Sequence, residues 1–328
     1  MTGDIVTCVI SGAQYALGGR HIREIVRGEH MRRDGRPDDA AGVVTVDGAK
    51  IPVHSLASIL TRHAGAGEAP QTAGRHIIVT QTSRGAVGWL VDRIARSKLP
   101  ADTQVTPLPP MLGRPATSWF EGLLRVEDRS LLLLSPEHLD PRAASAPPDR
   151  DECLLMSPPA RTTVPRGGIP AGLVVTFSSP ALPRCSAPRY ALSARRVAVV
   201  VRSLPVCMVP GSARFIVGVT FWRGEALPVI DFRDAADRDA TSDAHRFLVA
   251  RCGGPMSGTS VAFSVDAEMA LHQPTRDDRA ADDDVGFVPP FVAGMFDVGG
   301  NRLALLDLDA LLGAVPPEIR QSAGHQDC

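Results

Sequence analysis

An internal repeat constrains this chain more than any other feature of its sequence. The two tyrosines, Tyr15 and Tyr190, each begin the tripeptide Tyr-Ala-Leu and follow a strand-like apolar run. Residues 120–139 also align without gaps on residues 292–311. Six aligned positions are identical: Gly122/Gly294, Val126/Val298, Leu131/Leu303, Leu133/Leu305, Leu134/Leu306 and Leu139/Leu311. We therefore predict two tandem domains, residues 4–140 and 172–313.

The segment between the repeats, residues 141–171, is rich in Pro, Ser, Gly and Arg. Proline lacks a backbone donor and favours extended chain, so this composition predicts a linker. Its one apolar island, residues 153–156, could dock against a domain or a partner, or could belong to a solvated linker. The end of the chain, residues 314–328, reads as a polar tail.

Within each repeat the apolar residues recur mostly with a period of two, in short runs separated by Gly, Pro and Asp. This pattern predicts many short strands and tight turns, arranged as two small closed sheets per repeat. Short helical pieces are expected at residues 19–27, at residues 193–201 and at residues 307–313. In the last of these, Asp307 or Asp309 can cap the helix and Gly313 can end it.

Composition excludes several classes of protein. The 328 residues carry a net charge of −1, so no basic field favours nucleic acid or an anionic membrane. The six cysteines form no C-x-x-C pair, which fits a reducing compartment better than a disulfide framework. No apolar run approaches the roughly 18 residues of a membrane span, and no signal peptide is evident. We expect a cytoplasmic protein without direct membrane insertion.

Motifs for catalysis or cofactor binding fail on inspection. Residues 297–301 resemble part of a kinase nucleotide site, but the repeat alignment makes them a hairpin turn. The acidic run at 276–284 lacks the spacing of a calcium loop, and the histidines form no metal-binding pair. No nucleophile elbow or phosphate loop is present. We expect no enzyme activity, no cofactor and no metal.

The second repeat resembles the CheW-like domain of bacterial chemotaxis systems. The resemblance lies in Tyr-Ala-Leu at 190–192, a Val-Pro turn, an Arg-Gly bend followed by "LPVIDFRD", a Val-Asp strand and the closing "NRLALLDLDALLG". The first repeat shows the same landmarks in the same order, more weakly. The chain is thus similar to a tandem CheW-like protein whose first domain is degenerate.

This resemblance implies a fold and a function. The fold is mainly β with short helices, each domain being a pair of SH3-like five-stranded β-barrels. The function is that of a non-catalytic adaptor, coupling chemoreceptor signalling tips to the regulatory domain of a CheA-type histidine kinase. Other CheW-like domains are further possible partners. A small-molecule sensor and a purely structural array protein remain alternatives that reuse the same fold.

An arginine at a tight bend is the first candidate contact residue. Arg223 and Gly224 join two apolar strands, and Gly224 can take the positive φ that such a turn needs. A guanidinium at a rim offers several planar donors to carboxylates of another chain. Trp222, in place of a family leucine, is an aromatic anchor if exposed and a core residue if buried.

The repeats differ in charge at matching positions. The resemblance implies contact residues in a Val/Ile-x-Glu-Val/Ile pattern, which includes Ile22 and Glu24 in the first repeat. The second repeat has Val197 and Val199 there, so it has lost the acid. Conversely, the first repeat has Asp47 where the second has the bend arginine. Because charge inversion repels the partner that an arginine attracts, we expect that the repeats are not interchangeable. The second repeat is the better candidate for kinase or receptor contact, and the first either docks another partner or only scaffolds.

Overall fold

The structure is a computed structural model. It describes residues 4–33, 40–62, 76–98, 103–113, 116–126, 129–143, 172–178, 189–212, 215–232, 246–253, 258–266, 268–275, 278 and 291–313. The predicted linker beyond residue 143 and the predicted tail lie outside the described residues. So do the apolar island at 153–156 and most of the acidic run at 276–284.

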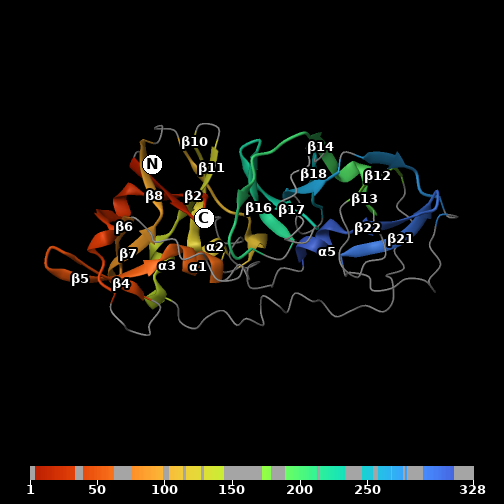
Figure 1. Ribbon diagram of the computed structural model, residues 1–328. Helices are drawn as coiled ribbons and strands as arrows, with labels where there is room; N and C mark the ends of the chain where they lie inside the picture. The colour runs from red at the N-terminus through yellow and green to blue at the C-terminus, as the bar shows by residue number, and fades with distance from the viewer. Residues whose placement is uncertain are drawn as a thin grey trace, which may run out of the picture. The chain divides into compact units, whose positions relative to one another are not determined.

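Strands dominate the fold and form four sheets, two in each repeat (Figure 1). The first sheet has the order β8 (Arg93–Lys98), β1 (Asp4–Ile10), β2 (Ala13–Gly18), β11 (Arg129–Leu134), β10 (Phe120–Val126) and β9 (Val105–Thr106). The second has the order β3 (Ile22–Arg27), β6 (His76–Thr82), β7 (Gly85–Val91), β5 (Ala49–Ser55) and β4 (Ala40–Val46).

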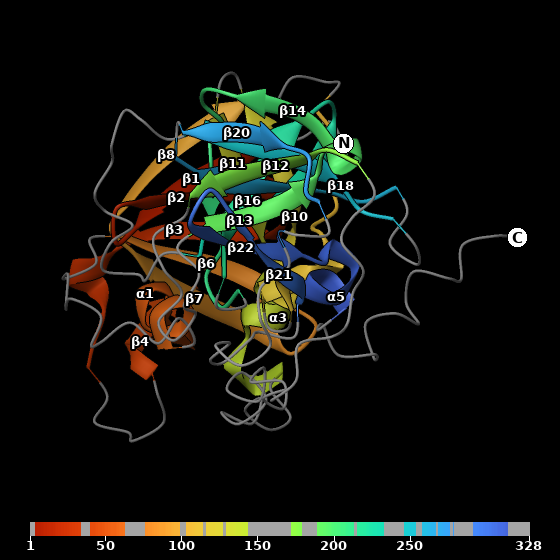
Figure 2. The same cartoon turned by 90° about the vertical axis from the view of Figure 1, so that its right-hand side faces the viewer.

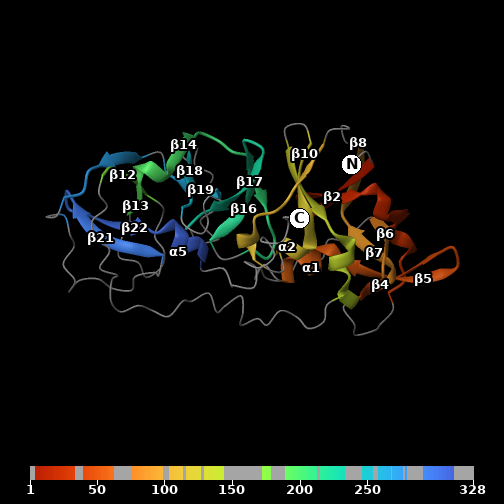
Figure 3. The same ribbon diagram turned by 180° about the vertical axis from the view of Figure 1, so that it is seen from behind.

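The second repeat has the matching pair of sheets. The third sheet has the order β20 (Met269–His272), β12 (Val174–Ser178), β13 (Arg189–Ser193), β22 (Asn301–Leu306) and β21 (Val292–Val298), and Figure 3 shows β21 beside β22. The fourth has the order β14 (Val197–Val201), β18 (Arg246–Arg251), β19 (Ser260–Val265), β17 (Glu225–Ile230), β16 (Ile216–Trp222) and β15 (Cys207–Met208).

The strand pairings confirm the duplication. Strands β2 and β11 pair in parallel with Tyr15 opposite Leu132, while β13 and β22 pair in parallel with Tyr190 opposite Ala304. Each Tyr-Ala-Leu strand therefore lies beside the leucine-rich strand that aligned in the two repeats. The other sheet of each repeat has its own parallel pair, β5 with β7 and β17 with β19.

The expectation of five strands per sheet is met in two of the four sheets. The first and fourth sheets gain a sixth strand, because the two-residue strands β9 and β15 pair with β10 and β16. In the second sheet, a bridge between Arg32 and Val43 joins the chain that follows β3 to β4. The two edges of this sheet meet there, as closure of a small barrel requires.

The chain divides into two compact units. The first unit contains the first repeat together with residues 205–212 and 218–226, and the second contains the rest of the second repeat.

The helices are short. They are α1 (Leu56–Arg62), α2 (Ala116–Trp119), α3 (Pro136–Leu139) and α5 (Leu308–Gly313), with single 3₁₀ turns η1 (Gly19–His21), η2 (Gly28–His30), η3 (Pro110–Leu112), η4 (Pro141–Ala143) and η5 (Ala194–Arg196). The helix predicted near the end is confirmed as α5. The Asp307 carboxylate caps it by accepting hydrogen bonds from the backbone N–H groups of Asp309 and Ala310.

The two helices predicted after the tyrosines were wrong. Each segment makes only one 3₁₀ turn, η1 or η5, and then becomes a strand, β3 or β14. The physical reason is the side chains: β14 is four valines and one alanine, and β3 contains Ile22, Ile25 and Val26. Branching at Cβ restricts side-chain rotamers in a helix and suits a pleated sheet.

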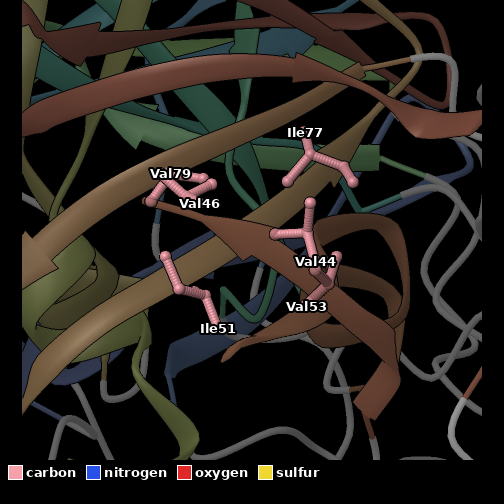
Figure 4. Close-up of a cluster of buried hydrophobic side chains, with 6 residues drawn as sticks. All are labelled: Val44, Val46, Ile51, Val53, Ile77 and Val79. Carbon is pink, nitrogen blue, oxygen red and sulfur yellow. The ribbon is translucent and has the colours of Figure 1, made fainter. Parts of the chain in front are cut away.

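The core follows the predicted period of two. In the second sheet, alternate residues of β4, β5 and β6 point inward and pack together (Figure 4). Successive side chains of a strand point to opposite faces, so every second residue shares the buried face. The cluster consists of Val44, Val46, Ile51, Val53, Ile77 and Val79.

Glycine permits a close strand approach at one matching position in each repeat. A Cβ on Gly42 would meet the carbonyl oxygen of Arg32, and a Cβ on Gly218 would meet that of Cys207. Only glycine leaves room for these backbones to approach so closely. The pair shows that the two repeats share close backbone contacts as well as strand order.

A polar cluster fixes the short helix α3 to the hairpin formed by β6 and β7. The Asp140 carboxylate, whose side chain has no exposed surface, accepts from the Arg142 guanidinium at 2.8 Å and from the Thr82 hydroxyl at 3.0 Å. Glu137 accepts from the hydroxyl and the backbone N–H of Ser83. These hydrogen bonds lower the pKa of Glu137.

The second repeat ends with a related contact. Asp309 of α5 accepts from the backbone N–H of Gly253, at the end of β18, and pairs with Arg196 at 3.1 Å. In both repeats, therefore, a carboxylate of the closing helix holds a hairpin of the other sheet. We assign both clusters to structure, because each carboxylate is bound to neighbouring protein groups.

Candidate protein-docking site

The bend predicted to carry a contact arginine is a two-residue turn between β16 and β17. Arg223 has φ of 51° and Gly224 has φ of 87°. Two successive residues with positive φ define the hairpin turn whose twist matches that of the flanking strands. Glycine takes this conformation freely, but for arginine it is uncommon, and sparsely populated backbone conformations cost roughly 1–3 kcal/mol.

The arginine is exposed at the tip of the turn. Its guanidinium carbon lies 4.7 Å from the centre of the Trp222 ring, a cation–π contact with its own neighbour. No carboxylate within the described part of the chain lies within ion-pair distance of Arg223. The indole is half-buried, so Trp222 serves partly as a support for the guanidinium and partly as packing.

The other predicted contact residues lie on matching strands. Val197 and Val199 are half-buried on β14, at one edge of the fourth sheet. On β3, Ile22 is half-buried and Glu24 is exposed. The structure thus brings Trp222, Arg223 and Gly224 into one turn, and places the remaining candidates on the edge strands β14 and β3.

A second surface was missed by sequence reasoning. In the third sheet, Leu271 on the edge strand β20 lies opposite Val175 on β12 and is 63% exposed. Leu173, two residues before Val175, is 49% exposed. Figure 2 shows β20, β12 and β13 side by side. We call Leu173, Val175 and Leu271 the apolar edge.

Among the described residues, the large apolar side chains that are exposed all lie in the second repeat. Besides the two leucines of the apolar edge, Val200 on β14 is 40% exposed and Met208 on β15 is 58% exposed. Sheet edges are normally protected by charged side chains, which prevent unwanted pairing. The sequence signal was available: β20 reads Met-Ala-Leu-His, whereas the matching β8 carries Arg93, Arg96 and Lys98.

Reactive groups are not prominent among the described residues. Burial raises the pKa of Cys8 to about 12 and that of Cys252 to about 11, so neither thiol is an activated nucleophile at neutral pH. No group of three or more potential metal ligands occurs among these residues. Likewise, none of the described helices is long and apolar enough to cross a membrane.

Comparison with known proteins identifies the family. The model of the CheW-like domain matches twice, at residues 4–142 and 182–315. The chain therefore belongs to the CheW-like family and carries the domain in tandem. The prediction made from the Tyr-Ala-Leu, Arg-Gly and Val-Asp landmarks is confirmed.

One relative and one solved structure are similar to parts of this chain. A probable chemotaxis protein CheW of Rhizobium etli is 32% identical over 98 residues, which are 30% of this chain and 61% of that protein. The chain thus spans less than two thirds of that relative's length. The crystal structure of the scaffolding protein TtCheW from Thermoanaerobacter tengcongensis is 20% identical, with a TM-score of 0.35. It covers 42% of this chain and 88% of its own.

Proposed function

We propose that this chain is a non-catalytic signalling adaptor that couples a chemoreceptor signalling tip to the regulatory domain of a CheA-type histidine kinase. It acts in the cytoplasm, at membrane-associated receptor arrays. The second repeat supplies the docking surfaces. Membership of the CheW-like family and the chemotaxis name of the Rhizobium etli relative support this proposal.

The observation that carries the proposal is the state of Arg223. A non-glycine residue in left-handed backbone is costly, and its guanidinium has no intramolecular carboxylate among the described residues. Within the described residues, the contact that the guanidinium makes in return is the cation–π contact with Trp222. A planar, multi-donor cation held on an indole at a turn suits a carboxylate on another protein.

Binding of the isolated kinase regulatory domain tests the proposal. We expect Arg223→Glu to raise Kd tenfold or more, which corresponds to about 1.4 kcal/mol. Arg223→Lys should have an intermediate effect, because an ammonium cannot reproduce the planar guanidinium contact. The matched control is Arg125→Glu, the same charge change at an exposed arginine of β10 in the first repeat.

Isothermal titration calorimetry gives Kd, and circular dichroism with thermal unfolding shows that each variant folds. Surface charges contribute little to stability, so the variants should unfold like the unmodified chain. A folded Arg223→Glu variant with Kd within twofold of the unmodified chain would remove Arg223 from the docking site.

A further inference from the structure

The two repeats have the same turn but opposite charge at its tip. Asp47 and Gly48 have φ of 48° and 76°, which matches the geometry of Arg223 and Gly224. The Asp47 carboxylate, however, is bound by the Arg23 guanidinium of β3 at 2.7 Å. The turn of the first repeat therefore carries an internally paired anion, whereas that of the second carries a cation with no ion-pair partner among the described residues.

The partner of this internal ion pair is absent from the second repeat. On β14, Ala198 stands where β3 has Arg23, in the same place relative to the tyrosine strand. The repeats thus differ by a linked pair of residues, Arg with Asp in one and Ala with Arg in the other. In the first repeat the turn carboxylate of Asp47 is paired with Arg23 within the domain. In the second repeat the guanidinium of Arg223 is available to bind another molecule.

The apolar edge is also specific to the second repeat. In β1 and β8, Val6 lies opposite Arg96, whereas the second repeat has Val175 opposite Leu271. Asp4, which is exposed and lies opposite Lys98, precedes Val6 by two residues, as Leu173 precedes Val175. Asp4 and Arg96 of the first repeat therefore stand where the second repeat has Leu173 and Leu271.

From the difference between the two turns we infer that the chain has one docking face for a kinase regulatory domain, at the Arg223 turn of the second repeat, and none at the matching Asp47 turn of the first. The inference rests on the proposed function and adds the number of partners bound. A partner that presents a carboxylate to Arg223 meets the carboxylate of Asp47 in the first repeat. Such a like-charge contact rejects the partner.

A single face has a consequence for assembly. Two equal faces would let one chain cross-link two kinase molecules through the same kind of contact. With one face, each chain binds one regulatory domain, so it cannot link two kinase molecules through that contact. The tandem chain then consists of one domain that docks the kinase and a second domain whose surface has a different charge.

The stoichiometry of the full chain with an excess of the regulatory domain of the CheA-type kinase tests the inference. Calorimetry and light scattering should both give one regulatory domain per chain. The variant Asp47→Asn, which keeps a residue suited to left-handed backbone but removes the anion, should leave Kd within twofold. Arg223→Glu, at the matching position of the second repeat, should raise Kd tenfold or more.

The outcomes separate the inference from the proposed function. Two regulatory domains bound per chain would overturn the single face while leaving the adaptor function intact. A tenfold loss of affinity in a folded Asp47→Asn variant would also overturn it, because the first repeat would then take part in docking. Absence of all binding would overturn the proposed function and the inference together.

Discussion

Replacement of Asp140 by asparagine tests how the first repeat is held together. The Asp140 side chain has no exposed surface and accepts hydrogen bonds from the backbone N–H, Nε and Nη2 of Arg142. It also accepts from the hydroxyl of Thr82 at the end of β6. Asparagine keeps the shape but loses the negative charge, so the guanidinium faces a neutral amide.

The expected cost follows from the burial of each partner. Removing one member of a fully buried ion pair costs about 3–5 kcal/mol, because the other charge stays buried and unpaired. Arg142 is 39% exposed, so water can solvate it in the variant. We therefore expect a smaller loss of unfolding free energy for the first repeat, about 2–3 kcal/mol.

Tryptophan fluorescence can report on the first repeat within the full chain. Of the three tryptophans, Trp89 and Trp119 belong to the first repeat, and both are buried. In a Trp222→Phe background, urea unfolding followed by fluorescence should show Asp140→Asn shifting the midpoint down by about 1 M. The control Glu29→Gln, in an exposed ion pair with Arg27, should change stability by less than about 0.5 kcal/mol.

The pH dependence gives an independent check with a definite sign. Burial opposes ionisation of Asp140, but hydrogen bonds from Arg142 and Thr82 outweigh burial and lower its pKa. A carboxyl group with a lowered folded pKa stabilises above its unfolded pKa, about 3.9, and loses this contribution as the pH falls through the folded value. The difference in unfolding free energy between the unmodified chain and Asp140→Asn should therefore be largest at pH 7 and become smaller on acidification. Equal stability at pH 7, or a gap that does not shrink in acid, would refute the reasoning.

Two further predictions concern packing and thiol reactivity. Gly218→Ala should lower the thermal unfolding temperature, at a cost of about 1–3 kcal/mol in unfolding free energy. The added Cβ would clash with the carbonyl oxygen of Cys207 on the neighbouring strand β15. An unchanged unfolding temperature would contradict this close approach of the two strands. Cys8 and Cys252 should react slowly with a thiol reagent at pH 8 in the native chain and rapidly in urea, since burial raises the pKa of both thiols. Site-resolved mass spectrometry measures this, and equal native and unfolded rates would count against burial.

Local patterns in the sequence predicted much of the fold. The duplication, the mainly β architecture, the Arg-Gly turn and the closing helix follow from period-two apolar residues, turn residues and capping residues that lie within a few positions of one another. The same local reasoning failed after the tyrosines, where β14 and β3 are strands. There, β-branched residues and pairing with β18 and β6 decide the structure.

The tertiary structure alone decided how charges and apolar side chains meet across the chain. The Arg23–Asp47 pair joins β3 to the turn before β5, and these strands are not neighbours in the second sheet. The apolar edge exists only because β20 pairs with β12 in the register that puts Leu271 opposite Val175. Alternation along a strand is set by neighbouring residues, so the sequence encodes it directly. Register and sheet closure depend on packing between distant segments, so only the folded chain shows that Leu271 is exposed and lies opposite Val175.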